Sequence, residues 1–365
     1  MIVAAFLAES GSGFSAALIK TAGIKNRGVL VDVAMWEPCD LVDSHNSMAR
    51  FRFAFPVRLL PIMVLSGLLV TTDSVVADSK NGFVLNDALV PPDEILRGGP
   101  GRDGIPSLDD PVFVKAGEAK FLSAKDRVLG IEINGIARAY PVRILNYHEI
   151  VNDSIAAEAI VITYCPLCGS GMAFSATIDG RRLEFGVSGL LYNSDVLLYD
   201  RQSKSLWSQI KKTAVTGPMK GTKLHAIPLS HTTWRDWQAR HPSTQVLSTD
   251  TGFRRNYKVS PYRGYSGSGK LYFPVAEQNS QYRRKSTVLG LEIDGQFKAY
   301  PFDELKKGPG QFTDEFQGRR FEVIYDKKNQ TARIVDPEGI ELPTLLVFWF
   351  AWYAFHPDTE IYTAI

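Results

Sequence analysis

The residues best suited to chemistry are two cysteines in the segment 164–169, which reads Y-C-P-L-C-G. They are two of the chain's three cysteines, and they directly follow the apolar run 159–163. A short apolar run of this kind is typical of a buried strand. We therefore expect Cys165 and Cys168 at the end of a strand, two residues apart and able to act together.

Three interpretations of this dithiol stay open. In the first, Cys165 and Cys168 bind one metal ion, with His148 completing the site and Met172 as a weak fourth ligand. Thiolate, thioether and imidazole together favour copper, while Cys and His also suit zinc, so we expect copper ahead of zinc. Such a protein would be a carrier or assembly factor, or it would hold a redox centre.

In the second interpretation, the pair is a metal-free thiol–disulfide centre, in which Cys165 attacks and Cys168 resolves the mixed disulfide. In the third, the pair forms a structural disulfide in a non-catalytic binding module. The residues do not decide whether the protein is an enzyme.

The chain contains an internal duplication. Residues 128–141 read V-L-G-I-E-I-N-G-I-A-R-A-Y-P, and residues 288–301 read V-L-G-L-E-I-D-G-Q-F-K-A-Y-P. A second shared pattern, W-x-x-W-x-x-x-H-P-x-T, begins at Trp234 and again at Trp349. Residues that both copies share are expected to serve the fold, and residues present in one copy only are candidates for a site.

The comparison of the copies singles out the dithiol and one histidine. Cys165 and Cys168 lie opposite Asp326 and Asn329, so the dithiol belongs to the first copy alone. His148 also has no counterpart, because the second copy carries Lys-Gly at that place. This difference makes His148 a candidate for a functional site rather than an ordinary structural histidine.

The stretch 186–209 of the first copy alternates strand-like runs with small polar residues and frequent aromatics. Such a stretch could line a pocket, or it could be a hairpin extension whose Asn and Ser serve turns. Asp195 could act as an acid, a base or a ligand. The residues expected to line a pocket, here and beside the cysteines, are Tyr147, Tyr164, Ser188, Tyr192, Asn193, Asp195 and Trp207.

The elements that must position these residues are mostly strands. Asn134-Gly135 between alternating apolar residues predicts a hairpin over 128–140, and residues 141–149 have helical spacing with Pro at the first turn. Further strands are expected over 159–164, 172–177 and 182–187. The fold predicted from these patterns is a β-rich α+β fold made of two related, unequal β units that arose by internal duplication.

The N-terminal part resembles a targeting segment rather than part of the fold. From Met48 a basic stretch precedes a short apolar run over 59–70 and small residues before Asp78, which is the pattern of a secretory signal peptide. A dozen apolar residues are too few to span a bilayer of about 30 Å. We expect residues 48–77 to be cleaved and residues 1–47 to come from an over-extended gene start. The alternative is an uncleaved internal hydrophobic segment.

These patterns predict a periplasmic or secreted protein with no membrane span after cleavage. Its hydrophobic content of 45%, charged content of 22% and net charge of +2 are ordinary for a soluble domain. No basic stripe for nucleic acid stands out, and a partner would be an unidentified protein or small molecule. The expected segments are a loop-rich lead-in at 78–126, the first β unit with the Cys-x-x-Cys site at 127–265, a linker at 266–287 and the shorter second unit at 288–365.

Four runs of the first copy, together with the cysteine motif, form a recognisable set. They are 147–153 (Y-H-E-I-V-N-D), 164–168 (Y-C-P-L-C), 185–195 (F-G-V-S-G-L-L-Y-N-S-D), 199–201 (Y-D-R) and 206–209 (L-W-S-Q). This set resembles the bacterial family known as domain of unknown function 3179. The resemblance implies an exported protein, but it implies no activity.

Overall fold

The computed structural model describes residues 79–364 of the 365-residue chain. The expected gene start, the signal peptide and Cys39 lie outside the described residues. Within 79–364, none of the helices has the length and apolar character needed to cross a bilayer.

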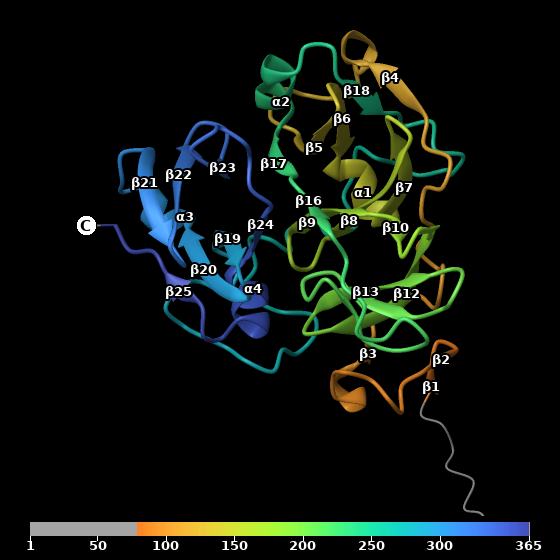
Figure 1. Ribbon diagram of the computed structural model, residues 1–365. Coiled ribbons are helices and arrows are strands. Elements are labelled where there is room, and N and C mark those ends of the chain that lie inside the picture. Colours follow the sequence, from red (N-terminus) through yellow and green to blue (C-terminus); the bar gives the residue numbers. More distant parts are fainter. Residues whose placement is uncertain (1–78, 365) are drawn as a thin grey trace, which may run out of the picture. The chain divides into compact units, whose positions relative to one another are not determined.

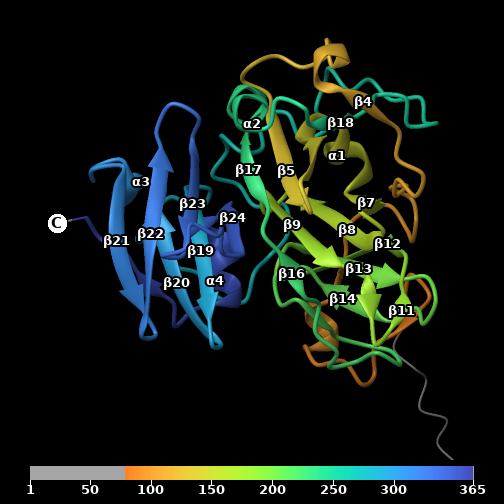
Figure 2. The same cartoon turned by 45° about the horizontal axis from the view of Figure 1, so that its top comes forward.

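Strands dominate the structure, and they form five sheets of three to five strands together with two short ribbons (Figures 1 and 2). The first sheet has the order β17-β5-β6-β18-β4. Its strands are β4 (Phe113–Lys115), β5 (Arg127–Ile133), β6 (Ile136–Pro141), β17 (Ser230–Thr233) and β18 (Gln245–Leu247). The second sheet has the order β16-β9-β8-β7. Its strands are β7 (Ile150–Ile155), β8 (Glu158–Cys165), β9 (Ser170–Ser175) and β16 (Ala226–Ile227).

The third sheet, in the order β15-β14-β13-β12-β3, comes from the stretch that only the first copy contains and from the lead-in. Its strands are β3 (Leu96–Arg97), β12 (Phe185–Tyr192), β13 (Asp195–Asp200), β14 (Leu206–Ser208) and β15 (Thr213–Ala214). The two ribbons pair β1 (Ser79–Lys80) with β2 (Phe83–Val84) and β10 (Thr177–Ile178) with β11 (Arg181–Arg182).

The second copy supplies the other two sheets. One has the order β24-β19-β20-β25, with β19 (Thr287–Ile293), β20 (Gln296–Pro301), β24 (Thr344–Phe348) and β25 (Glu360–Ile361). The other has the order β21-β22-β23, with β21 (Gln311–Phe316), β22 (Arg319–Asp326) and β23 (Thr331–Val335). The α-helices are short: α1 (Val142–His148), α2 (Trp234–Arg240), α3 (Phe302–Leu305) and α4 (Trp349–Phe355).

The expected α+β class with two unequal units is wrong. Strands make up 41% and helices 11% of the structure, and the sheets are arranged in a manner similar to a five-bladed β-propeller. The physical reason lies in the core, because one buried cluster joins Val161 and Phe174 of the first copy to Val347 and Trp352 of the second. Each copy also has a buried cluster of its own, but this shared cluster packs the two copies against each other.

The local predictions for the first copy are confirmed. Asn134 and Gly135 both have positive φ and join β5 to β6, as a two-residue hairpin turn requires. The helix expected over 141–149 is α1, and the strand expected before the cysteines is β8.

Equivalent strands of the two copies pair in the same register, Val128 with Pro141 in one and Val288 with Pro301 in the other. Each hairpin carries a glycine beneath a tryptophan of a later helix, α2 in the first copy and α4 in the second. A Cβ on Gly130 would lie 2.3 Å from Trp237, and a Cβ on Gly290 would lie 2.0 Å from Trp352. Both glycines are therefore packing requirements of the shared fold.

Candidate metal centre

The cysteines lie on the hairpin turn between β8 and β9. Cys165 is the last residue of β8 and pairs with Ser170, while Cys168 lies within the turn. The backbone N–H of Cys168 donates to Cys165 Sγ at 3.4 Å, and Gly169 follows with φ +64°. Both thiols are free and buried. This turn brings the two sulfur atoms to the same side of the hairpin, as zinc-ribbon sites do.

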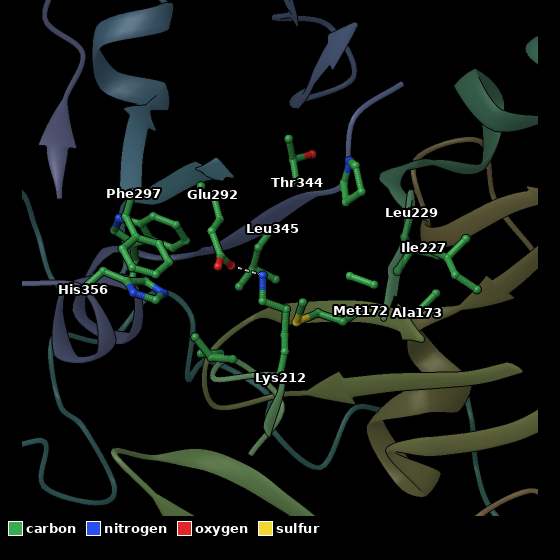
Figure 3. A pocket seen from close by; sticks show the side chains of 15 residues that line it. Met172, Ala173, Lys212, Ile227, Leu229, Glu292, Phe297, Thr344, Leu345 and His356 are labelled. Carbon is green, nitrogen blue, oxygen red and sulfur yellow. Dashed lines mark hydrogen bonds and ion pairs between the residues drawn. The ribbon is translucent and has the colours of Figure 1, made fainter. Parts of the chain in front are cut away.

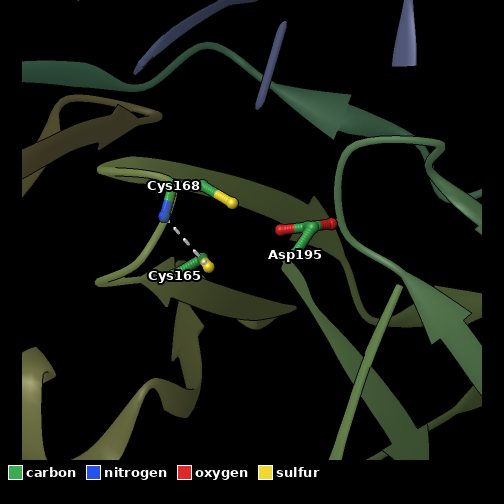
Figure 4. A group of neighbouring side chains, drawn as sticks. All are labelled: Cys165, Cys168 and Asp195. Carbon is green, nitrogen blue, oxygen red and sulfur yellow. Dashed lines mark hydrogen bonds between the residues drawn. The ribbon is translucent and has the colours of Figure 1, made fainter. Parts of the chain in front are cut away.

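A carboxylate from a different hairpin completes the group. Asn193 and Ser194 form the tight turn between β12 and β13, and Asp195 is the first residue of β13. One ligand atom each from Cys165, Cys168 and Asp195 lie within 4.8 Å of one another, and all three residues are buried (Figure 4). The Ser194 carbonyl accepts from Cys165 Sγ at 3.7 Å and from Cys168 Sγ at 3.3 Å.

Burial controls the electrostatics of this group. It raises the pKa of Asp195 to about 7, against donation from the Ile210 N–H to Oδ2 at 3.1 Å. The other carboxylate oxygen, Oδ1, is buried without a hydrogen-bond partner among the described residues. Burial also raises the pKa of Cys168 well above its ordinary value, and the neighbouring Cys165 adds to this. Burial therefore favours the neutral forms of Asp195 and Cys168, and a nearby positive charge would be needed to ionise them.

The structure does not bring His148 into this group. The histidine is fully buried at the end of α1, and both ring nitrogens have partners. Nδ1 lies 2.8 Å from the Pro106 carbonyl oxygen, and Nε2 lies 2.7 Å from the Tyr257 hydroxyl. Burial lowers the pKa of His148. Asp195 stands beside the thiols where His148 was expected.

Met172 packs in the same buried cluster as the two cysteines, but it lines a different cavity from Cys165. It lines a small cavity of about 30 Å³ between the two copies, together with Lys212, Glu292 and His356 (Figure 3). Lys212 and Glu292 form an ion pair there. Met172 and Cys165 lie on the same face of the hairpin, because Met172 pairs with Thr163 and Cys165 pairs with Ser170.

Of the residues expected in a pocket, Tyr147 lines a cavity next to Cys165, and its hydroxyl donates to the Val259 carbonyl at 2.6 Å. Tyr164 and Trp207 are buried in hydrophobic clusters. The Trp207 indole N–H donates to Asp200 Oδ2 at 2.9 Å, which makes this pair part of the packing of the third sheet.

The remaining three residues hold the hairpin that presents Asp195. The Ser188 hydroxyl donates to a carbonyl of the neighbouring strand β13. Asn193 accepts from the Ala276 N–H at 2.8 Å and donates to the Ala354 carbonyl at 3.2 Å. Tyr192 packs edge-on against Phe355. These contacts fix the position of Asp195 rather than line an open pocket.

The cavity next to Cys165 has a volume of about 330 Å³, and its lining includes an acidic residue that was not predicted as part of a site. Glu149 is buried there, and burial raises its pKa to about 7, while the Tyr262 hydroxyl donates to Oε1 at 3.2 Å. The signal in the sequence was its position, since Glu149 directly follows His148 where the second copy is rich in glycine.

Comparison with known proteins identifies one relation. A family profile described as "Protein of unknown function (DUF3179)" matches residues 102–359, which is more than half of the chain. Searches of curated proteins and of solved structures find no match.

Proposed function

The chain belongs to the DUF3179 family of proteins of unknown function, and we propose that it binds one metal ion, zinc ahead of copper, at Cys165, Cys168 and Asp195. The observation that carries the proposal is the cluster itself, in which two thiols and a carboxylate meet in a buried site. We further propose that the protein works in the periplasm or outside the cell, from the pattern over residues 48–77.

The charge of the cluster supports a cation as its occupant. Three groups that would be anionic when ionised lie within 4.8 Å of one another, and Asp195 Oδ1 has no hydrogen-bond partner among the described residues. A buried polar atom without a partner is unfavourable. A metal ion would satisfy this oxygen and would stabilise both thiolates, with release of their protons.

The donor atoms favour zinc. Copper was expected on the basis of an imidazole and a thioether. The His148 imidazole is hydrogen-bonded elsewhere and Met172 lines a different cavity, while two thiols and one carboxylate meet in the cluster. Thiolates suit both metals, whereas a carboxylate is a harder ligand that zinc accepts more readily than copper(I). Three protein ligands also leave one position open, as in zinc sites that bind a further ligand.

A second candidate function is thiol–disulfide exchange, favoured by the unequal surroundings of the two thiols. Cys165 lines the 330 Å³ cavity, whereas Cys168 is fully buried with Asp195 beside it. In this reaction the Cys165 thiolate attacks a partner disulfide and releases one partner thiol. Cys168 then passes its proton to Asp195 and attacks the mixed disulfide, and the second partner sulfur leaves as a thiolate that takes the proton back from Asp195. The protein is oxidised and the partner is reduced.

Zinc affinity of the reduced chain, measured by competition with a chromophoric chelator, tests the metal proposal. We expect one equivalent bound, and an affinity at least about a hundredfold lower in Cys165→Ser and in Cys168→Ser. Asp326→Ser and Asn329→Ser, at the equivalent turn of the second copy, serve as controls and should bind as wild type does. Equal affinity in all four variants and the wild type would contradict the proposal. Disulfide reduction by the metal-free protein would favour exchange instead.

A further inference from the structure

Glu149 occupies a backbone position that the second copy gives to glycine. It follows α1 with φ +58°, and Gly310 precedes β21 with φ +87°. Hydrogen bonds establish the equivalence, since the Glu149 carbonyl accepts from the Tyr164 N–H at 2.7 Å and the Gly310 carbonyl accepts from the Tyr325 N–H at 2.6 Å. Positive φ is unfavourable for a residue with a side chain. The first copy thus retains a glutamate against the preference of its own backbone.

The side chain of Glu149 is also in an unfavourable place. It is 6% exposed, and the Tyr262 hydroxyl is its one side-chain hydrogen-bond partner among the described residues. No basic side chain of residues 79–364 forms an ion pair with it; Arg255 lines the same cavity without doing so. A buried carboxylate without a cation is destabilising. Backbone strain together with an unpaired buried acid points to a functional role, because such features persist at ligand sites.

The cavity around Glu149 has the size and the walls of a site for a small organic molecule. Its volume of about 330 Å³ exceeds what isolated waters need. Apart from Glu149, Tyr147, Tyr262, Arg255, Asn146 and Cys165, its side chains are largely apolar. The apolar wall includes Ile105, Leu167, Val187, Leu190, Leu191 and Val196.

We infer that this cavity binds a small organic amine, with the ammonium group on the Glu149 carboxylate and the apolar body against the cavity wall. An ammonium supplies both the positive charge and the hydrogen-bond donors that the carboxylate lacks, and such charge-assisted bonds are the strong ones. An alcohol would supply one neutral donor, and a carboxylate would be repelled by Glu149 and could bind only through Arg255. This site goes beyond the proposed metal centre and does not depend on it.

Calorimetric titration of the full chain at pH 8 with hexylammonium, hexan-1-ol and hexanoate tests the inference. We expect hexylammonium to bind, and to bind at least about tenfold more weakly to Glu149→Gln. Glu132→Gln is the matched control, because Glu132 lines a different cavity of about 230 Å³, and it should bind as wild type does. Cys168→Ser, whose side chain does not line this cavity, should also retain binding, which separates this site from the metal centre.

Three results would overturn the inference. They are the absence of hexylammonium binding, equal binding of hexylammonium and hexan-1-ol, and unchanged binding in Glu149→Gln. If Glu149→Gln fails to fold, Glu149→Gly takes its place, since the second copy forms the same turn with glycine. We expect Glu149→Gly to fold with an unchanged or higher melting temperature and to lose hexylammonium binding; retained binding would again overturn the inference.

Discussion

The hairpin turns after β8 and after β22 are equivalent in the two copies, and the first residue of each makes the same contact. In the first copy Cys165 Sγ accepts from the Cys168 N–H at 3.4 Å, and in the second Asp326 Oδ1 accepts from the Asn329 N–H at 3.0 Å. The turn needs a side-chain acceptor at its first position. It does not need sulfur, so the fold alone does not explain the thiols.

The two turns also differ in the polar contacts that surround them. Asn329 Oδ1 accepts from Thr233 at 2.8 Å and from Arg235 at 3.0 Å, so the second turn is satisfied by polar contacts within the protein. The first turn faces the Ser194 carbonyl and a carboxylate with an unpartnered oxygen. The two copies share the backbone of the turn and its hydrogen bond. Among the described residues, the thiols and the carboxylate oxygen without a partner occur only in the first copy, and they lie at the same place.

The largest effects on stability are expected where the copies agree. Gly130→Ala and Gly290→Ala each place a methyl group against a buried tryptophan ring, at 2.3 Å and 2.0 Å. Overpacking of this kind costs about 3 kcal/mol. We expect both variants to lower the free energy of unfolding by a similar amount in urea. A clear loss in one variant only would show that the copies do not share this packing requirement.

The pH dependence of the free energy of unfolding, measured on the metal-free protein, tests whether the first copy differs from the second in its buried carboxyl groups. Burial raises the pKa of Glu149 from 4.5 and of Asp195 from 3.8, both to about 7. A carboxyl group whose pKa is higher in the folded state than in the unfolded state binds more protons in the folded state. Its contribution to the free energy of unfolding therefore falls as the pH rises from about 4 to 7. Each group should lower the free energy of unfolding by on the order of 3 kcal/mol over this window.

Denaturant unfolding from pH 4 to pH 8 measures this dependence. Glu149→Gln and Asp195→Asn should each flatten the curve, whereas Asp326→Asn, in the second copy, should not flatten it. Curves for the two first-copy variants that are as steep as the wild-type curve would contradict the assignment of these carboxyl groups as buried and unpaired.

Asp195→Asn is expected to weaken zinc binding without disturbing the fold. Asparagine keeps the shape of the side chain and removes the charge, and loss of one anionic ligand should lower the affinity at least about tenfold. Chelator competition measures the change. Unaltered zinc affinity in this variant would show that Asp195 is not a zinc ligand and that only the two thiols belong to the site.

The smallest effects on the free energy of unfolding are expected from substitutions at the two equivalent positions with positive φ, Glu149 and Gly310. Glu149→Gly should stabilise the protein by about 1 kcal/mol and Gly310→Ala should destabilise it by about 1 kcal/mol, because only glycine adopts this conformation without strain. The comparison belongs at pH 4, where the Glu149 carboxyl is protonated in the folded state. Changes of the same sign in both variants would show that the two positions are not equivalent.

Local sequence patterns were sufficient to predict the hairpin at Asn134-Gly135, the helix α1 and the strand that leads to Cys165, because each depends on residues close in the chain. The core that the two copies share was not predictable, because the contact between β9 and β24 joins segments about 170 residues apart. Asp195 reaches the thiols through the placement of a separate hairpin, which no spacing in the sequence reveals.

The role of Glu149 was hidden for a different reason. The two copies align at an offset of 160 over their first hairpins, but Glu149 and Gly310 are equivalent at an offset of 161. One extra residue in the second copy therefore places the glutamate opposite a proline in the printed sequence. Only the hydrogen bonds of the following strands show that its partner is a glycine.

The most direct test of the metal centre is metal analysis with thiol counting on one sample, purified without oxygen and without added metal. The account predicts about one equivalent of zinc or copper per chain, two thiols that react only after the metal is chelated, and neither property in the double variant Cys165→Ser with Cys168→Ser. A metal-free protein with Cys165 and Cys168 joined in a disulfide would contradict it.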